Sequence, residues 1–199
     1  MAEEKPLRDR LIDAGVELVL SEGTSAVGLR EIARRAGVSH GAPRRYFPTH
    51  HALLSAIAKR GFEDLAARFA AVTQPSAPPR EQLRALGRAY VDHALEHRGM
   101  FELMFRHDLL DSERHDPSDR PRLREATLPV FGLLVDLVAH ERPGPAPAVT
   151  AAALWSNLHG IAQLWAWGSL PLVVGDTDGR QLDRLLTAAL DAHLGPVST

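Results

Sequence analysis

The chain has 199 residues, no cysteine and a formal net charge of −2 at pH 7. Without cysteine it has no disulfide or thiolate metal site, and 45% hydrophobic residues are enough for one sizeable core or for a small domain joined to a larger one. The N-terminal residues do not resemble a secretory signal, and no segment approaches the roughly 18 apolar residues of a membrane span, so we expect a cytoplasmic protein without a membrane partner.

The charge is unevenly distributed along the chain. Residues 23–60 contain seven Lys or Arg and one acidic residue, Glu31, whereas residues 61–199 contain 13 basic and 18 acidic residues. A basic segment in an otherwise acidic chain indicates an anionic partner, most often nucleic acid. A solvated helical face is the alternative explanation.

Apolar residues at helical spacing begin near the N-terminus. Four of them, separated by 4, 3 and 4 positions, predict an amphipathic helix over residues 7–21 (Leu7, Leu11, Ala14 and Leu18). A short helix is predicted over residues 29–36, with Gly28 as its N-cap and Gly37 in the left-handed position after its end.

A second short helix is predicted over residues 39–47, directly after that turn. Ser39 is its N-cap candidate, and Pro43 is expected to tighten its first turn because proline has no backbone N–H. Pro48 ends it, and Thr49 caps a long helix that continues toward a Pro-rich stretch at residues 73–80. This stretch is the expected hinge of the chain.

Helical spacing continues to the C-terminal end, and no segment shows the period-2 pattern of a strand. The sequence therefore predicts an all-α fold of about nine helices, with residues 1–50 as a three-helix helix-turn-helix domain, 51–72 as a connecting helix and 73–199 as a C-terminal regulatory and dimerisation domain. The later helices are expected near residues 83–94, 99–107, 121–140, 148–168 and 179–194, with a polar loop at 108–120 and a kink or break at Pro129.

Two short helices that meet at a glycine-containing turn form a helix-turn-helix. In this motif the second helix lies in the DNA major groove, and its first residues contact the base edges. Arginine can donate two hydrogen bonds to guanine, and tyrosine or histidine can donate to backbone oxygens. The candidate DNA-contacting residues are Arg30, Ser39, His40, Gly41, Ala42, Arg44, Arg45, Tyr46, Thr49 and His50.

The stretch "LREIARRAGVSHGAPRRYFPTHHALL" resembles the DNA-binding domain of the tetracycline-repressor (TetR) family of bacterial regulators. The shared features are the IA-x-x-AGVS helix and turn, the aromatic pair that ends the reading helix, and the polar residues and leucine pair that follow. The resemblance extends over residues 7 to about 65. In the C-terminal half, "LWSNLHG" at 154–160 is similar to the Trp-His-Gly signature of one type of regulatory domain in this family.

Two positions depart from the family pattern. Arg44 stands where the family usually has a tyrosine, which removes one family contact and supplies a guanidinium that can bind guanine. His50 stands where the family usually has a lysine, so a permanent charge is replaced by one that depends on pH near neutrality. DNA binding is therefore expected to weaken as the pH rises toward 8.

A competing hypothesis rests on "HALEH", residues 93–97, which fits the H-x-x-E-H pattern of inverted zinc peptidases. His93 and His97 would lie one turn apart on a helix and bind zinc, with Glu96 as the base of a zinc-dependent hydrolase. A five-residue pattern arises easily by chance in a chain with ten histidines, and no third ligand stands out. We therefore predict no enzyme activity, no metal and no cofactor.

Aromatic residues gather in the C-terminal half, where helical spacing is usually that of a core. Trp155, His159 and Gln163 nevertheless share one helical face, and an apolar wall with a few polar groups is typical of a small-molecule site. The same face also suits packing on a second subunit, and the sequence does not separate the two. The candidate ligand-binding residues are Phe101, Phe105, Phe131, Trp155, His159 and Gln163.

The sequence thus predicts a homodimeric regulator, a repressor, that binds a palindromic operator in double-stranded DNA and is released by a small-molecule effector. A helix-turn-helix module that binds another protein is a third possibility. The dimer interface is expected from the helices near 148–168 and 179–194, because both are apolar and carry small residues (Ala151, Ala152, Gly160, Ala162, Ala188 and Ala189).

Overall fold

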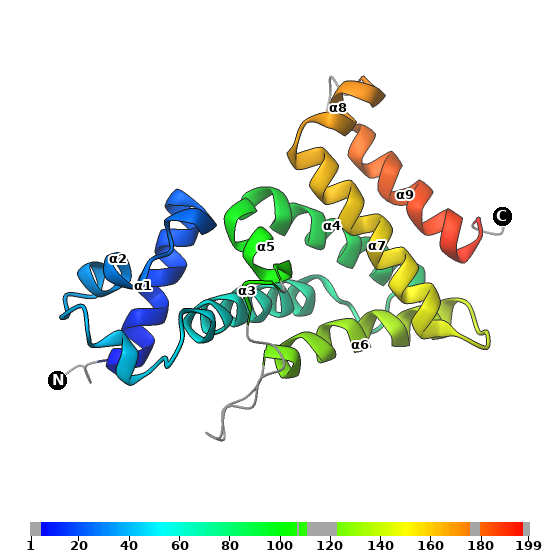
Figure 1. Ribbon diagram of the computed structural model, residues 1–199. Helices are drawn as coiled ribbons and strands as arrows, with labels where there is room; N and C mark the ends of the chain where they lie inside the picture. Colours follow the sequence, from blue (N-terminus) through cyan, green and yellow to red (C-terminus); the bar gives the residue numbers. More distant parts are fainter. Residues whose placement is uncertain (1–4, 107, 111–122, 176–179, 197–199) are drawn as a thin grey trace. The chain divides into compact units, whose positions relative to one another are not determined.

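The computed structural model, described for residues 5–106, 108–110, 123–175 and 180–196, is helical throughout (Figure 1). These residues form nine α-helices and two single 3-10 turns, and no strand occurs among them. The predicted all-α fold is therefore confirmed. None of the described helices combines the length and the apolar character needed to cross a membrane.

The helices pack as two compact units. The first consists of Met1–Asp64 and His97–Thr127, and the second of Leu65–Glu96 and Leu128–Thr199. The long helix α3 (His50–Val72) contributes its first part to one unit and its second part to the other. The predicted domain boundaries at residues 50 and 72 divide the chain by function. The two units divide it by packing, so these boundaries stay a prediction.

The first unit is built on α1 (Leu7–Glu22), α2 (Leu29–Arg35), the start of α3 and α5 (Arg98–Phe105). Helix α1 packs on both α2 and α5. The close approach of α1 to α3 needs a residue without a side chain, because a Cβ on Gly15 would lie 2.3 Å from Cδ1 of Ile57. The core of this unit includes Leu11, Leu18, Ile32, Leu53 and Ile57, all fully buried.

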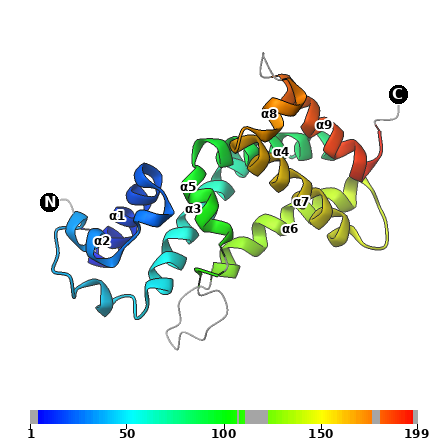
Figure 2. The ribbon, with the colours of Figure 1, turned by 45° about the horizontal axis from the view of Figure 1, so that its top comes forward.

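The second unit contains α4 (Pro79–Glu96), α7 (Pro147–Ala166) and α9 (Arg180–Leu194), which pack against one another. Figure 2 shows the short helix α8 (Ser169–Val174) at one end of the α7–α9 pair. Helix α6 (Leu123–Glu141) is tied to α4 and α9 because Arg80 forms ion pairs with both Glu141 and Asp191. Leucines from the three packed helices fill the core (Leu83, Leu86, Leu154, Leu158, Leu186 and Leu190).

The structure differs from the predicted elements at three places. The segment 39–47 is not an α-helix and contains only the 3-10 turn Pro43–Arg45. Helix α8 was not predicted. Of the two outcomes predicted at Pro129, the break is wrong because helix α6 continues through it, and the kink stays a prediction. Most of the loop predicted at 108–120 lies outside the described residues.

Candidate DNA-contacting surface and effector site

The corner after α2 is a complete helix-ending motif of the Schellman type. The N–H of Val38 donates to the carbonyl of Ala33 at 2.9 Å, and the N–H of Gly37 donates to the carbonyl of Arg34 at 3.1 Å. Gly37 has φ +69°, the left-handed conformation that favours glycine. The predicted roles of Gly28, the residue before α2, and of Gly37 are thus confirmed.

The segment that follows is wound more tightly than the predicted reading helix. The N–H groups of Ala42, Arg45 and Tyr46 each donate to the carbonyl three residues earlier, at 3.0–3.2 Å. Pro43 has no N–H with which to reach Ser39, so an α-helical bond is lost where that helix would begin. Ser39 is not the N-cap of an α-helix, because the only helical turn of this segment begins at Pro43, after Ala42.

The predicted DNA-contacting side chains lie at the surface of this corner. Arg30, Ser39, His40, Gly41, Arg44, Arg45 and Thr49 are exposed, and Ala42, Tyr46 and His50 are half-buried. Nine of the ten lie between the end of α2 and the first residue of α3, and Arg30 lies in the first turn of α2. Whether each of them touches DNA stays a prediction.

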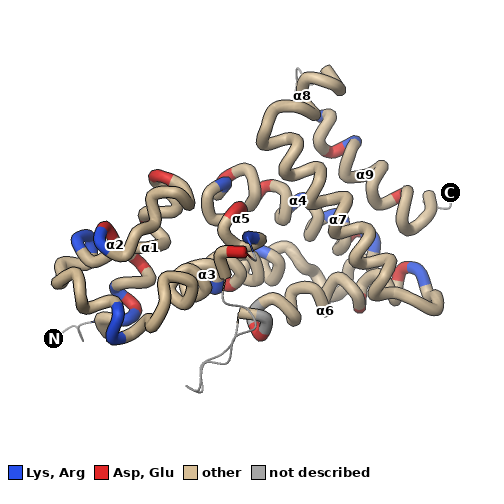
Figure 3. The backbone as a smooth tube through the Cα atoms, viewed as in Figure 1, with Lys and Arg blue, Asp and Glu red and all other residues tan. Residues whose placement is uncertain are grey.

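The basic residues of this region fall into two groups. Arg34 and Arg35 both donate to Glu31, and Arg35 also pairs with Glu22. These hydrogen bonds lower the pKa of Glu31 to about 2, first from Arg34 and then from Arg35. Within the described part of the chain, no ion pair engages Arg30, Arg44 or Arg45. Figure 3 shows Lys and Arg gathered on α2 and on the chain that follows it.

Thr49 and His50 connect this surface to α3. The hydroxyl of Thr49 accepts the N–H of Ala52 at 3.0 Å, which confirms the predicted cap. The Nε2 of His50 lies 2.8 Å from the carbonyl of Val27, to which it donates. The imidazole thus anchors the start of α3 to the chain before α2, and only its Nδ1 is left for another partner. A neutral ring donates nothing from Nδ1, so a phosphate contact there requires the protonated form.

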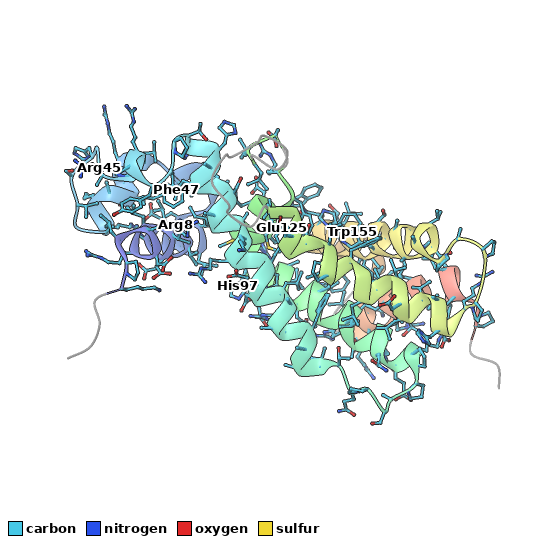
Figure 4. The ribbon with its side chains drawn as sticks, turned by 90° about the horizontal axis from the view of Figure 1, so that it is seen from below. Arg8, Arg45, Phe47, His97, Glu125 and Trp155 are labelled. Carbon is cyan, nitrogen blue, oxygen red and sulfur yellow. The ribbon has the colours of Figure 1, made fainter. Side chains whose placement is uncertain are left out.

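Two arginines of α1 support the surface, and sequence reasoning did not single them out. The guanidinium of Arg8 lies over the ring of Phe47, 5.5 Å from its centroid, and Figure 4 shows these two side chains together, with Arg45 at the outer edge. Arg10 donates from Nη2 to the carbonyl of Ala36 at 2.8 Å and so caps the end of α2. Nothing in the sequence distinguishes Arg8 and Arg10 from ordinary solvent-exposed arginines of a surface helix.

The candidate effector residues fall into two groups. Phe101 is buried in the first unit and stands edge-on to Phe105, with 5.0 Å between ring centroids. Phe105 in turn stands edge-on to Phe62 of α3 at 5.6 Å. These two phenylalanines thus pack with the helices that carry the DNA-contacting corner.

The other group lies in the second unit, where Phe131 of α6, Trp155 and His159 are all half-buried. The ring of Phe131 stands edge-on to that of Trp155, with centroids 6.3 Å apart, and the rings of Trp155 and His159 are 5.9 Å apart. Gln163, two turns further along α7, is also half-buried. Sequence reasoning missed a fifth member, Tyr90 of α4, whose hydroxyl hydrogen-bonds with both Trp155 and His159.

The zinc-site hypothesis placed both histidines on one helix, and the structure does not. Helix α4 ends at Glu96, and His97 is the N-cap residue of α5, so the two histidines do not share a helical turn. The carboxylate of Glu96 is paired with Arg68 at 2.7 Å. The prediction that both histidines lie on one helix is therefore wrong, whereas zinc binding by the two histidines is not tested by this helix boundary.

Comparison with known proteins covers both parts of the chain. Residues 11–57 match the bacterial regulatory proteins of the tetR family, and residues 83–190 match the tetracyclin repressor-like C-terminal domain. The transcriptional regulator BetI of Rhizobium meliloti is 37% identical over 79 residues. That match covers 40% of this chain, and the chain spans 39% of the length of BetI.

Two solved structures share the fold over nearly the whole chain. A protein of unknown function from Rhodococcus sp. RHA1 has 31% identity and a TM-score of 0.73, with 97% of this chain and 96% of that one covered. RolR, solved in complex with resorcinol, has 22% identity and a TM-score of 0.66, with 94% of this chain and 86% of that one covered. Since the C-terminal match alone takes in more than half of the residues, the chain belongs to the tetracycline-repressor (TetR) family of bacterial regulatory proteins.

Proposed function

We propose that this protein is a sequence-specific DNA-binding transcriptional regulator, acting as a repressor that a small-molecule effector releases from its operator. The observation that carries the DNA-binding part is the corner between α2 and α3. It presents Arg30, Arg44 and Arg45 at the surface, while Glu31 neutralises the arginines on α2 itself. Exposed guanidinium groups at a helix-turn-helix corner suit the major groove.

The functional unit is a homodimer on a palindromic operator. One helix-turn-helix contacts too few base pairs for useful specificity, so two copies are expected, with centres about 34–36 Å apart or a multiple of that distance. Bound in this way over a promoter, the dimer represses transcription by occupying the site that polymerase needs.

The surface that supports this dimer lies on α7 and α9. An open groove of about 400 Å³ runs between α7, α8 and α9, and most of its lining is small or apolar (Asn157, Gly160, Ile161, Leu164, Leu170, Leu185, Ala188 and Ala189). Exposed apolar side chains flank it, with Trp167, Leu172 and Val173 exposed by 72%, 83% and 80%. Apolar patches of this kind mark protein interfaces.

The inner faces of the same helices serve the fold of the monomer. Ala151, Ala162, Leu158 and Leu186 are all buried within the second unit. Of the small residues predicted for the interface, Gly160 and Ala188 therefore support the dimer, whereas Ala151 and Ala162 support the packing of α7 within the unit. Two α7–α9 pairs across a two-fold axis form a four-helix bundle.

The effector binds beside Phe131, Trp155 and His159 in the second unit. The half-buried rings offer apolar contact, and the imidazole and indole offer polar groups, which is the usual composition of a small-molecule site. RolR, which shares the fold, was solved with an aromatic ligand. Such a ligand changes operator affinity only if it binds the two conformations of the dimer unequally.

The test of DNA binding starts from a pool of random duplexes, from which the purified protein selects its preferred site. Arg45→Ala is then expected to lose ~1–3 kcal/mol of affinity for that site and to relax preference at one base pair. Arg84→Ala, which removes an exposed charge from α4, is the matched control and is expected to bind like wild type. Failure of the wild-type protein to enrich any sequence would refute the proposal.

A further inference from the structure

A side chain of α1 holds the turn that follows α2. The half-buried Arg10 donates from Nη2 to the carbonyl of Ala36 at 2.8 Å, and the same nitrogen would stand 4.0 Å from a Cβ added to Gly37. The last carbonyls of a helix carry partial negative charge, and a cation that donates to one of them forms a charge-assisted hydrogen bond. Arg10 therefore fixes the point at which the chain leaves α2.

A second side chain of α1 reaches the other end of the segment 39–47. The guanidinium of Arg8 lies over the ring of Phe47, 5.5 Å from its centroid (Figure 4), and this ring is buried. The face of an aromatic ring attracts a cation. The Nη1 of Arg8 also lies 3.7 Å from the carboxylate of Asp9 in the same helix. Helix α1 thus contacts the chain just before the segment, through Arg10, and at its last residue, through Arg8.

The segment between these two contacts has little regular structure of its own. Its one helical element is the 3-10 turn Pro43–Arg45, and the hydrogen bonds of such a turn have poorer geometry than those of an α-helix. The exposed side chains of Arg44 and Arg45 start from this turn. A base contact through two parallel hydrogen bonds requires a narrow range of guanidinium orientations, whereas a single contact to a phosphate tolerates more. Movement of the turn therefore reduces base selectivity more than overall affinity.

We propose that Arg10 and Arg8 are positioning residues of the DNA-contacting corner: from α1 they hold the two ends of the segment 39–47 and thereby set how strongly Arg44 and Arg45 discriminate between base pairs. The proposal rests on the proposed base contacts of Arg44 and Arg45. A corner that loses either anchor keeps its basic side chains and still binds phosphates, so the affinity for DNA of arbitrary sequence is largely retained. The preference for one sequence falls, because the backbone that carries the two guanidinium groups is no longer held in place.

The anchor at Arg10 is tested in the free full-length protein by amide hydrogen exchange, followed by NMR. Arg10→Met removes the donor but keeps the length of the side chain, and the N–H groups of Gly37 and Val38 are expected to exchange about tenfold faster than in wild type. Arg10→Lys can still donate to the carbonyl and is expected to restore most of this protection. Arg98→Met removes an exposed arginine of the same unit, on α5, and is expected to change neither rate. Unchanged rates in Arg10→Met, or rates that rise equally throughout the unit, would overturn the proposal.

The effect on selectivity is measured with the duplex that wild type selects and with a duplex of random sequence. Arg10→Met is expected to lower the ratio of the two affinities about tenfold, and Arg8→Ala about threefold, while the affinity for the random duplex changes by less than about threefold. Arg10→Lys and Arg8→Lys keep a cation at each anchor and are expected to restore most of the ratio.

Equal losses of affinity for the two duplexes would show that Arg10 and Arg8 contribute charge alone, and would overturn the proposal. If wild type prefers no sequence, the proposed function fails and the role of the two arginines in selectivity falls with it. The amide exchange of Gly37 and Val38 is measured without DNA, so it reports on the anchor independently of the proposed function.

Discussion

Glu31 decides which arginines of the N-terminal unit are available to a nucleic acid. It accepts from Arg34 at 2.6 Å and from Arg35 at 3.0 Å, so these two cations are already partnered within the protein. The sequence count of seven basic residues between 23 and 60 therefore overstates the charge presented to DNA. Charge counting finds the basic segment but does not find the intrahelical pairs, although the i, i+3 and i, i+4 spacing of Glu31 with both arginines predicts them.

Glu31→Gln is expected to strengthen binding to DNA of any sequence and so to lower specificity. The hydrogen bonds that lower the pKa of Glu31 to about 2 keep it ionised at every pH of interest. Its removal releases Arg34 toward phosphates and leaves Arg35 with Glu22 alone. Fluorescence anisotropy with a random duplex is expected to show several-fold tighter binding and a steeper salt dependence. Glu63→Gln, which breaks similar pairs on α3 with Lys59 and Arg60, is the control. Equal effects of the two substitutions would contradict this explanation.

The stability of the second unit is expected to fall in mild acid because of His159. Burial lowers the pKa of this imidazole below its ordinary 6.5. Below pH 6.5 the unfolded chain therefore binds more protons than the folded chain, and the free energy of unfolding decreases until the folded imidazole is also protonated. The melting temperature of wild type is expected to drop more steeply between pH 7 and pH 5.5 than that of His159→Gln. Parallel curves would show that His159 contributes nothing.

Element boundaries were predictable wherever proline, glycine or a capping side chain stood at the end of a helix. Gly28, Gly37 and Thr49 all occupy the positions that were expected of them. The structure of segment 39–47 was not predictable in this way. Pro43 lacks the N–H of one α-helical hydrogen bond, and the free energy lost with that bond exceeded the stabilisation from the segment's few apolar residues. Helix α8 was missed because six residues are too few to show a period, although Gly168 and Gly175, both left-handed, enclose it.

Gly37→Ala is expected to destabilise the DNA-binding corner by ~1–2 kcal/mol, because a residue with a Cβ is strained in the left-handed conformation. Gly37 has φ +69°, and the two hydrogen bonds that end α2 depend on that conformation. Gly41→Ala is the matched control, since φ is not positive there and an added Cβ meets nothing within 4 Å. Urea unfolding of both variants followed by circular dichroism measures the difference. A control as unstable as Gly37→Ala would contradict the backbone explanation.

For the molecule as a whole, the sequence predicted which helices are apolar but not which of their faces point outward. Helix α7 has apolar or small residues on nearly every side, so its periodicity does not separate the inner face at Leu154 and Leu158 from the outer stripe at Gly160 and Leu164. Only the packing of α4 and α9 against α7 resolves the two. A charge placed at Leu158 or Leu186 is thus expected to unfold the unit and says nothing about assembly.

Ala188→Glu is the substitution that tests the dimer itself. Ala188 is exposed and lines the groove between α7, α8 and α9, so a carboxylate there is tolerated in a monomer but is buried without a partner in a bundle of four helices. Light scattering at micromolar concentration is expected to give wild type a mass of about twice 21.7 kDa and to give Ala188→Glu the mass of a monomer with an unchanged circular dichroism spectrum.

The matched control is Ala70→Glu, which places the same charge on an exposed position of α3 and is expected to remain dimeric. Loss of the dimer should also lower affinity for a palindromic operator far more than affinity for a single half-site, because two linked contacts bind with a higher effective concentration than one. A wild-type protein that scatters as a monomer of 21.7 kDa and binds one half-site as tightly as two would refute the dimer and, with it, the role of the α7–α9 surface.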